Sequence, residues 1–202
     1  MHWINAMLVI TMVLLILGKE GMEIIGVEKS LRVPVKRLHA YIGHIFIITF
    51  MLRIIWGFMG NAYARWSDMI PYKKENWAAI RTNIKWYLSG FKGRPAHIIG
   101  HDPLASLFYI ALFIVLIGQA LTGLLLSGLE FKTFPGVLIT GGLGEASAKG
   151  LKHAIGGVHE FGMLFILFFL AAHLTGLAVH ELKEKTGLFS SMIHGKKYFP
   201  KE

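Results

Sequence analysis

The sequence predicts an all-α membrane protein, a four-transmembrane-helix bundle, from its composition and its apolar runs. Hydrophobic residues make up 54% of the 202 residues, whereas charged residues make up only 16%. Four apolar runs stand out, at about residues 2–18, 38–60, 103–129 and 158–180. The last three exceed, and the first approaches, the roughly 20 residues that a helix needs to cross a bilayer. No linker, repeat or low-complexity tract interrupts the chain, so residues 1–202 are expected to form a single domain.

The first run, residues 2–18, has a second interpretation as a secretory signal peptide, which also contains a short apolar core. The basic segment that opens a signal peptide is missing, because His2 and Trp3 follow Met1 directly. No A-x-A-like cleavage site closes the run either. We therefore expect a retained helix.

Between the second and third runs, residues 76–91 are expected to form an amphipathic helix, with an apolar stripe opposite Arg81 and Lys85. The stripe consists of Trp77, Ile80, Ile84, Tyr87, Leu88 and Phe91. Such a helix lies in the membrane interface and contacts either lipid or a partner subunit. Asp102 and Pro103 supply an N-cap and a first-turn proline for the third long helix.

Residues 130–157 are glycine-rich and are expected to form a loop before the fourth run. Gly141, Gly142 and Gly144 could suggest a nucleotide-binding motif. No predicted strand precedes them and no βαβ unit surrounds them, so that interpretation is disfavoured.

The net charge of +9 fits a topology signal better than a nucleic-acid surface. Twelve lysines and arginines lie in residues 61–102 and in the C-terminal tail, against eight in residues 19–37 and 130–157. The positive-inside rule then places both termini in the cytoplasm, and the basic residues near lipid headgroups.

Histidine is the residue type that carries the chemistry. The chain has no cysteine, which excludes disulfides, thiolate-bound zinc, Cys-ligated iron–sulfur clusters and covalently attached c-type haem. Four of its ten histidines lie inside or at the rims of the apolar runs: His2, His39, His159 and His173. A charged side chain in lipid costs about 2.5 kcal/mol or more, so an ionisable residue there usually has a function. Neutral imidazoles can ligate haem iron in pairs, and four histidines would serve two irons. The sequence therefore predicts two non-covalent haems b.

Helix direction predicts which histidines pair. With the N-terminus inside, His2 begins the first helix at the inner surface, whereas His39 and His159 begin their helices at the outer surface. His173 lies 14 residues after His159, which is about 21 Å deeper on nearly the same helix face. The expected pairs are therefore His39 with His159 near the outer surface and His2 with His173 near the inner one.

A small residue lies one turn from each of these histidines, where a porphyrin needs room. These residues are Ala6 for His2, Gly43 for His39, Gly162 for His159 and Gly176 for His173. Glycine is also common in membrane helices in general, which is the simpler explanation.

Arg53 and His44 are the other residues of interest on the second helix. Arg53 lies 14 residues after His39, at the depth of the inner pair, where a haem propionate or a quinone headgroup could supply an anionic partner. The alternative is that Arg53 reaches the interface past Trp56. His44 is the main competitor of His39 as a ligand. The remaining histidines are expected to be interfacial or solvated: His97, His101, His153, His180 and His194.

These residues occur in an order that resembles the cytochrome b subunit of membrane-bound nickel–iron hydrogenases. The motifs are His2-Trp3, His39-x-x-x-Gly43 with Arg53, Trp56-Gly57-Phe58, Gly60-Asn61, Trp86-Tyr87-Leu88, Gly100-His101-Asp102-Pro103, Thr122-Gly123, the spacing of His159 and His173, and Ser191-Met192-Ile193 with Gly195. The resemblance covers nearly the whole chain. Gly60-Asn61 and Gly100-His101 favour the hydrogenase branch of a superfamily that also includes bacterial cytochrome b561 proteins and formate dehydrogenase and thiosulfate reductase cytochromes. Family members usually carry further residues before the His-Trp pair, whereas only Met1 precedes it here.

The resemblance implies four helices that bind two haems b through His2, His39, His159 and His173, in the bacterial inner membrane. It implies a periplasmic donor with hydrogenase or iron–sulfur subunits, quinone as the acceptor, and an electron-transfer subunit rather than a catalyst by itself. A homo-oligomer formed through the partner complex is one arrangement that it allows. The chain itself lacks the cysteines that a nickel–iron site requires.

Three alternatives remain open at this point. The donor could be formate dehydrogenase or a multihaem enzyme, or the chain could be a free-standing cytochrome b561 that oxidises superoxide. A transporter or channel could use the histidines as a proton relay, and it would show no visible absorption. A membrane anchor would keep its spectra and quinone reduction unchanged after its histidines are replaced.

Overall fold

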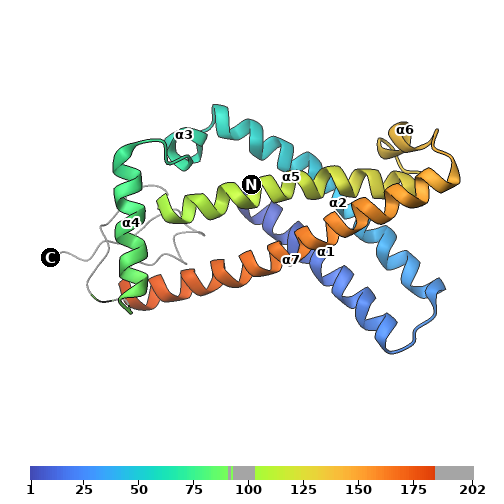
Figure 1. The fold of residues 1–202 in the computed structure, drawn as a ribbon, viewed down its shortest axis with the longest axis horizontal. Coiled ribbons are helices and arrows are strands. Elements are labelled where there is room, and N and C mark those ends of the chain that lie inside the picture. Colours follow the sequence, from blue (N-terminus) through green and yellow to red (C-terminus); the bar gives the residue numbers. More distant parts are fainter. Residues whose placement is uncertain (91, 93–102, 185–202) are drawn as a thin grey trace. The chain divides into compact units, whose positions relative to one another are not determined.

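The computed structural model describes residues 1–90, 92 and 103–184, and every regular element in them is helical (Figure 1). The helices are α1 (His2–Ile24), α2 (Lys29–Met59), the 3-10 helix η1 (Ala62–Ala64), α3 (Trp66–Met69), α4 (Lys74–Leu88), α5 (Pro103–Phe131), α6 (Gly136–Thr140) and α7 (Glu145–Glu184). The predicted all-α class is confirmed for this part of the chain.

The helices group into two compact units, and α5 and α7 each run through both. The first unit consists of Met1–Met69 and Phe113–Met163, and the second of Ile70–Leu112 and Leu164–Glu202. The prediction of a single domain over residues 1–202 stays a prediction.

Three of the described helices are long and apolar enough to cross a membrane: α2, α5 and α7 over Glu145–Val179. α5 and α7 contain the predicted runs 103–129 and 158–180, and α2 contains the run 38–60 except for residue 60. Many of their large apolar side chains are exposed; Ile114 and Phe161, for example, are 65% and 73% exposed. That exposure suits helices covered by lipid rather than by water. The first predicted run forms α1, which is not among the three, so the fourth span stays a prediction.

The helices extend beyond the apolar runs, which corrects two predicted loops. The loop predicted at residues 19–37 shrinks to the four residues between α1 and α2. Most of the loop predicted at residues 130–157 is helical, because it contains α6 and the first turns of α7. Hydropathy marks only the apolar part of a helix, whereas the turns beyond it are polar.

Ion pairs stabilise the polar turns that join α1 to α2. Lys19 Nζ lies 2.7 Å from a Glu20 carboxylate oxygen and 3.0 Å from a Glu23 oxygen, the latter an i,i+4 pair that supports the helix. Arg32 on α2 also pairs with Glu23. The hydrogen bonds that Glu23 accepts, first from Lys19 and then from Arg32, lower the pKa of its carboxyl.

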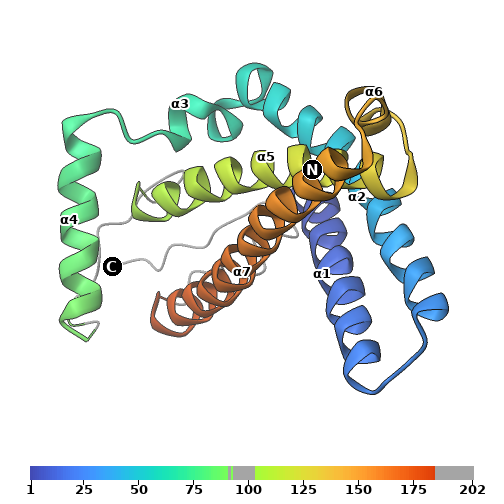
Figure 2. The ribbon, with the colours of Figure 1, turned by 45° about the vertical axis from the view of Figure 1, so that its right-hand side comes forward.

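α1 and α2 run antiparallel and side by side in the first unit (Figures 1 and 2). Two hydrogen bonds fix their register. Thr49 Oγ1 donates to Asn5 Oδ1 at 2.8 Å, and nearer the turn His39 Nδ1 lies 3.0 Å from the carbonyl oxygen of Met12.

The chain folds back on α2 immediately after α2 ends. Trp66 Nε1 donates to the carbonyl oxygen of Ile54 at 3.2 Å, and Arg65 Nε donates to that of Gly60 at 2.8 Å. The indole ring of Trp66 occupies the space that a side chain at Gly57 would need. Gly57 therefore allows Trp66 to lie directly against α2.

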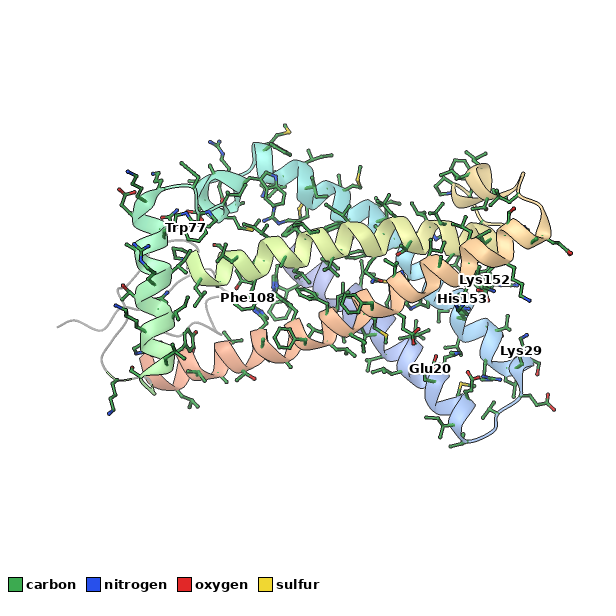
Figure 3. The ribbon with its side chains drawn as sticks, in the orientation of Figure 1. Glu20, Lys29, Trp77, Phe108, Lys152 and His153 are labelled. Atoms are coloured by element: carbon green, nitrogen blue, oxygen red, sulfur yellow. The ribbon has the colours of Figure 1, made fainter. Side chains whose placement is uncertain are left out.

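In the second unit, α4 forms where the amphipathic helix was predicted, but its buried face differs from the predicted stripe. Its buried residues are Ile80, Asn83 and Trp86. Trp77, labelled in Figure 3, is 48% exposed, and Leu88 is 83% exposed. Phe91 and the predicted N-cap Asp102 lie outside the described residues.

Replacing Gly57 with alanine should destabilise the protein by about 1–3 kcal/mol, because the added methyl group overlaps Trp66. Thermal unfolding of the purified protein in detergent, followed by tryptophan fluorescence, would measure this. Gly21→Ala is the matched control, since nothing lies within 4 Å of a side chain at that position in α1. Equal unfolding temperatures for the two variants would contradict the contact.

Candidate functional site

His39 on α2 and His159 on α7 face one another within the first unit. Their ring centroids are 6.3 Å apart, and the ring planes are nearly perpendicular, at 81°. The structure thus brings together the two histidines that were predicted as the outer pair. They do not begin their helices, however, because α2 starts ten residues before His39 and α7 starts fourteen residues before His159.

The same nitrogen of each ring is engaged by a hydrogen bond. The Met12 carbonyl can only accept, so His39 Nδ1 carries the proton and donates to it. His159 Nδ1 lies 2.8 Å from Thr122 Oγ1, whose own proton goes to the Gly118 carbonyl at 2.7 Å. The Thr122 oxygen therefore accepts from His159 Nδ1. Both neutral imidazoles keep the lone pair of Nε2 for a metal.

Residues of α5 surround His159. Gln119 Nε2 donates to the backbone carbonyl of His159 at 2.7 Å. A Cβ atom at Gly123 would lie 3.3 Å from Cε1 of the imidazole, so the ring rests against the bare backbone of α5. Gly162 was predicted to leave room for a porphyrin, but the Gln119 amide fills the space beside it.

Gly43 and His44 on α2 lie close to the pair. A Cβ atom at Gly43 would make only an ordinary 3.6 Å contact with Met12 Sδ, and its proposed role beside a porphyrin stays a prediction. His44 Nδ1 lies 2.7 Å from the Ala40 carbonyl of its own helix, and its buried Nε2 has no hydrogen-bond partner. The ring that faces His159 belongs to His39, which favours His39 over His44 as the ligand.

Arg53 lies against two aromatic rings of the first unit. Its guanidinium carbon is 5.5 Å from the centre of the Trp66 ring and 5.4 Å from that of Phe113, which are cation–π distances. Its buried Nη1 has no hydrogen-bond partner. The guanidinium can therefore still donate a hydrogen bond from Nη1 to an anionic or carbonyl oxygen.

The register of α1 against α2 places His2 near the level of Arg53. The Thr49–Asn5 hydrogen bond joins the two helices. His2 lies about one turn from Asn5 toward the start of α1, and Arg53 lies one turn from Thr49 toward the end of α2. Because the helices are antiparallel, the start of α1 and the end of α2 lie at the same end of the helix pair, so His2 and Arg53 lie at a similar level. His2 is exposed and contacts Trp3 edge-on at 5.4 Å.

His173 belongs to the second unit, where aromatic rings hold it. It stacks on Phe169 with centroids 5.6 Å apart and planes 10° apart, and it meets Tyr109 edge-on at 6.1 Å. Nothing lies within 4 Å of a side chain at Gly176. Because His2 and His173 belong to different units, their pairing stays a prediction.

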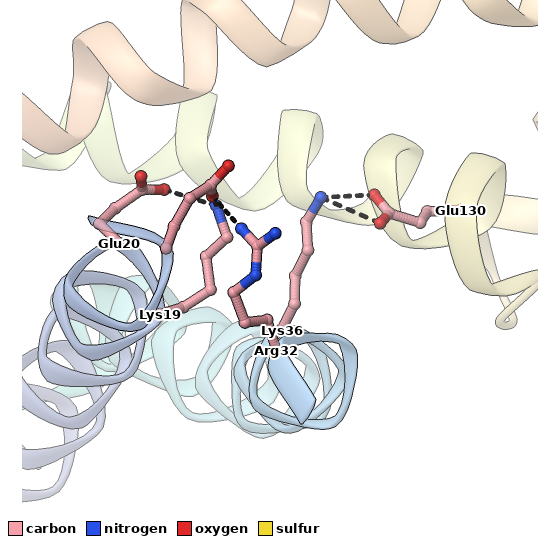
Figure 4. Close-up of polar contacts among 6 residues, drawn as sticks. Lys19, Glu20, Arg32, Lys36 and Glu130 are labelled. Atoms are coloured by element: carbon pink, nitrogen blue, oxygen red, sulfur yellow. Dashed lines mark hydrogen bonds and ion pairs between the residues drawn. The ribbon is translucent and has the colours of Figure 1, made fainter. Parts of the chain in front are cut away.

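An ion cluster joins three helices of the first unit about one turn from His39. Lys36 Nζ lies 2.7 and 3.0 Å from the carboxylate oxygens of Glu130 (Figure 4). Lys152 Nζ approaches the same carboxylate at 3.3 Å. The cluster ties α2, α5 and α7 together at this end of the unit.

The other predicted histidines do not join the site. His153 projects from α7 as an exposed residue (Figure 3), and His97, His101 and His194 lie outside the described residues, as does the side chain of His180. The motifs Gly100-His101-Asp102 and Ser191-Met192-Ile193 with Gly195 lie outside them too. Among the residues that are described, no three His, Asp or Glu side chains converge to hold a bare metal ion. A haem iron needs only two axial ligands.

Comparison with known proteins defines the class. The family model of prokaryotic cytochrome b561 matches residues 1–195, so the chain belongs to this family of membrane b-type cytochromes. The resemblance predicted from the motifs is thereby confirmed. No solved structure matches the chain.

Similar proteins from several bacteria carry the name "Probable Ni/Fe-hydrogenase B-type cytochrome subunit". The protein of Azotobacter chroococcum mcd 1 is 24% identical over 98% of this chain and 84% of its own length. That of Rhodobacter capsulatus is 27% identical over 98% and 78%. The hydrogenase 1 cytochrome subunit of Escherichia coli K12 is 32% identical over 44% of this chain and 38% of its own length.

Replacing Gly123 with valine should lower the haem content of the purified protein, because the new side chain displaces the His159 ring. Haem absorbance per chain measures this. Gly118→Val, on the same helix with nothing within 4 Å, is the matched control and should keep its haem. Equal haem contents in both variants would show that the ring position is unimportant.

Proposed function

We propose that the chain is the membrane electron-transfer subunit of a hydrogenase-like enzyme and passes electrons through two haems b between a periplasmic donor and the quinone pool. The facing pair of His39 and His159 is the observation that carries this proposal. The names of the similar proteins support a hydrogenase as the donor.

The geometry of the outer pair suits one iron between two imidazoles. A metal–imidazole bond is only about 2.0 Å long, so two imidazoles that would hold one metal must lie close together. The observed separation of the ring centres is 6.3 Å. In addition, histidine ligands of metals usually donate their other N–H to a carbonyl or similar acceptor, as both rings do here.

For the inner haem we propose His2 and His173 as ligands, on the basis of their spacing in the sequence. A fourth span formed by α1 belongs to the same proposal. Support comes from the level of His2 beside Arg53, whose unpartnered nitrogen suits a propionate or a quinone headgroup. The distribution of basic residues around the apolar runs supports cytoplasmic N- and C-termini, with the outer pair toward the periplasmic donor.

When bound, the haem groups supply one-electron carriers in the membrane interior. The chain's own residues do the rest. His39 and His159 would hold a haem and, together with burial, set its potential, while the aromatic rings beside Arg53 hold the guanidinium in place. Hydrogen oxidation belongs to the partner, because no cysteine is present to hold nickel and iron.

Alanine at His39 or at His159 should remove the same b-type component, and the haem content should fall from about two to about one per chain. A pyridine haemochrome assay with chain quantitation, together with reduced-minus-oxidised spectra, measures both. His44→Ala is the matched control on the same helix and should keep both haems. A chain without visible absorption would support a proton relay instead, and unchanged spectra in both variants would support a simple anchor.

Replacing Arg53 with leucine should remove the partner of an anion or carbonyl group. If that partner is a haem propionate, the midpoint potential of one haem falls, because a nearby positive charge is lost. If it is a quinone headgroup, the KM for quinone rises instead. Arg37→Leu is the matched control, since Arg37 also stacks on a ring, that of Phe131 at 5.4 Å, at the other end of α2. No change in either quantity would contradict the assignment.

A further inference from the structure

The two facing histidines differ in the kind of acceptor that engages them. His39 donates to a backbone carbonyl, that of Met12, which every residue type would supply. His159 meets a side-chain hydroxyl, that of Thr122. Only the second acceptor depends on the identity of an amino acid, so only the second can be removed by a substitution.

The hydroxyl of Thr122 is oriented by its own helix. Its oxygen lies 2.7 Å from the Gly118 carbonyl and 3.3 Å from that of Gln119, which leaves its proton on the helix side. A threonine bonded to the carbonyl four residues earlier is common in membrane helices and needs no further explanation. The 2.8 Å contact with His159 Nδ1 is the additional feature, and it turns the oxygen lone pair toward the ring.

Neighbouring residues of α5 limit how the His159 ring can move. Gly123 brings the backbone of α5 to the Cε1 side of the ring, and Gln119 ties the His159 carbonyl to the same helix. The hydroxyl at position 122 thus acts on an imidazole whose position is already restricted.

We propose that Thr122 is a positioning residue that fixes the Nδ1-protonated tautomer of His159 and strengthens its Nε2 as a ligand of the outer haem. The inference rests on the proposed function. A hydrogen bond accepted from Nδ1–H makes the imidazole more electron-rich, which stabilises the oxidised iron and lowers the haem potential.

The experiment is a redox titration of the two b-type components in membranes that contain the full chain. Thr122→Val replaces the hydroxyl by a methyl group of similar size, and it should shift one component to a more positive potential. Thr122→Ser keeps the hydroxyl and should restore the wild-type value. The other component should stay unchanged in both variants.

Thr140→Val is the matched control. Thr140 is 1% exposed, and its hydroxyl donates to the Gly136 carbonyl at 3.0 Å, also four residues earlier, but it makes no hydrogen bond to a histidine in the described structure. Both potentials should stay unchanged in this variant. A similar shift in Thr140→Val would mean that any lost threonine hydroxyl perturbs the bundle, and it would overturn the proposal.

Two further outcomes are decisive. If Thr122→Val binds both haems with unchanged potentials, the hydrogen bond does not act on the iron and the proposal is wrong. If Thr122→Val loses a haem, recovery in Thr122→Ser supports the role of the hydroxyl, whereas loss in both variants overturns it. His159→Ala separates these results from the proposed function, because a failure of that function would leave its haem content equal to that of the wild type.

Discussion

A neutral imidazole among apolar helices cannot leave its N–H group unpaired, and the first unit is arranged around this constraint. His39 and His159 come from α2 and α7, but their hydrogen-bond acceptors come from α1 and α5. All four long helical segments of the unit therefore take part in positioning this one pair of rings. Each hydrogen bond fixes the tautomer of its imidazole as well as the position of the ring. The fold therefore leaves Nε2 of each ring as the nitrogen that could bind a metal.

Composition was sufficient to predict an all-helical fold with three candidate spans, and helix direction predicted that His39 and His159 lie close together. Composition was wrong about where the helices begin. The first turns of α2 and α7 carry Lys29 and Arg32, and Glu145 and Lys149, so hydropathy assigned them to loops. Intrahelical hydrogen bonds and ion pairs make such turns helical whether or not they are apolar. The predicted depths stayed useful because the pairing depended on the relative positions of the histidines along each helix.

The surroundings of the pair could not be predicted in the same way. The Met12 carbonyl carries no side-chain signal, and Thr122 entered only as part of the Thr122-Gly123 motif. Its role depends on the rotation of α5 relative to α7, which a single sequence does not specify. Arg53 was expected to need an anion, but the rings that cover it come from a fold-back through Trp66 and from Phe113 on another helix. In the sequence, Gly57 was the one residue that pointed to this close packing, and only the structure shows that the indole ring of Trp66 lies beside it.

The extra helical turns change where the outer pair lies in the first unit. At 1.5 Å per residue, His39 lies about 15 Å from the start of α2, and His159 lies about 21 Å from the start of α7. The turns beyond the pair are polar and carry the cluster of Lys36, Glu130 and Lys152, a group that favours water or headgroups over hydrocarbon. The boundary of the apolar region thus falls close to the pair, and the helices continue beyond it. In the proposed function, a haem held at this level would be shielded by apolar side chains on one side and would lie near the polar turns on the other, where an electron donor outside the membrane would approach.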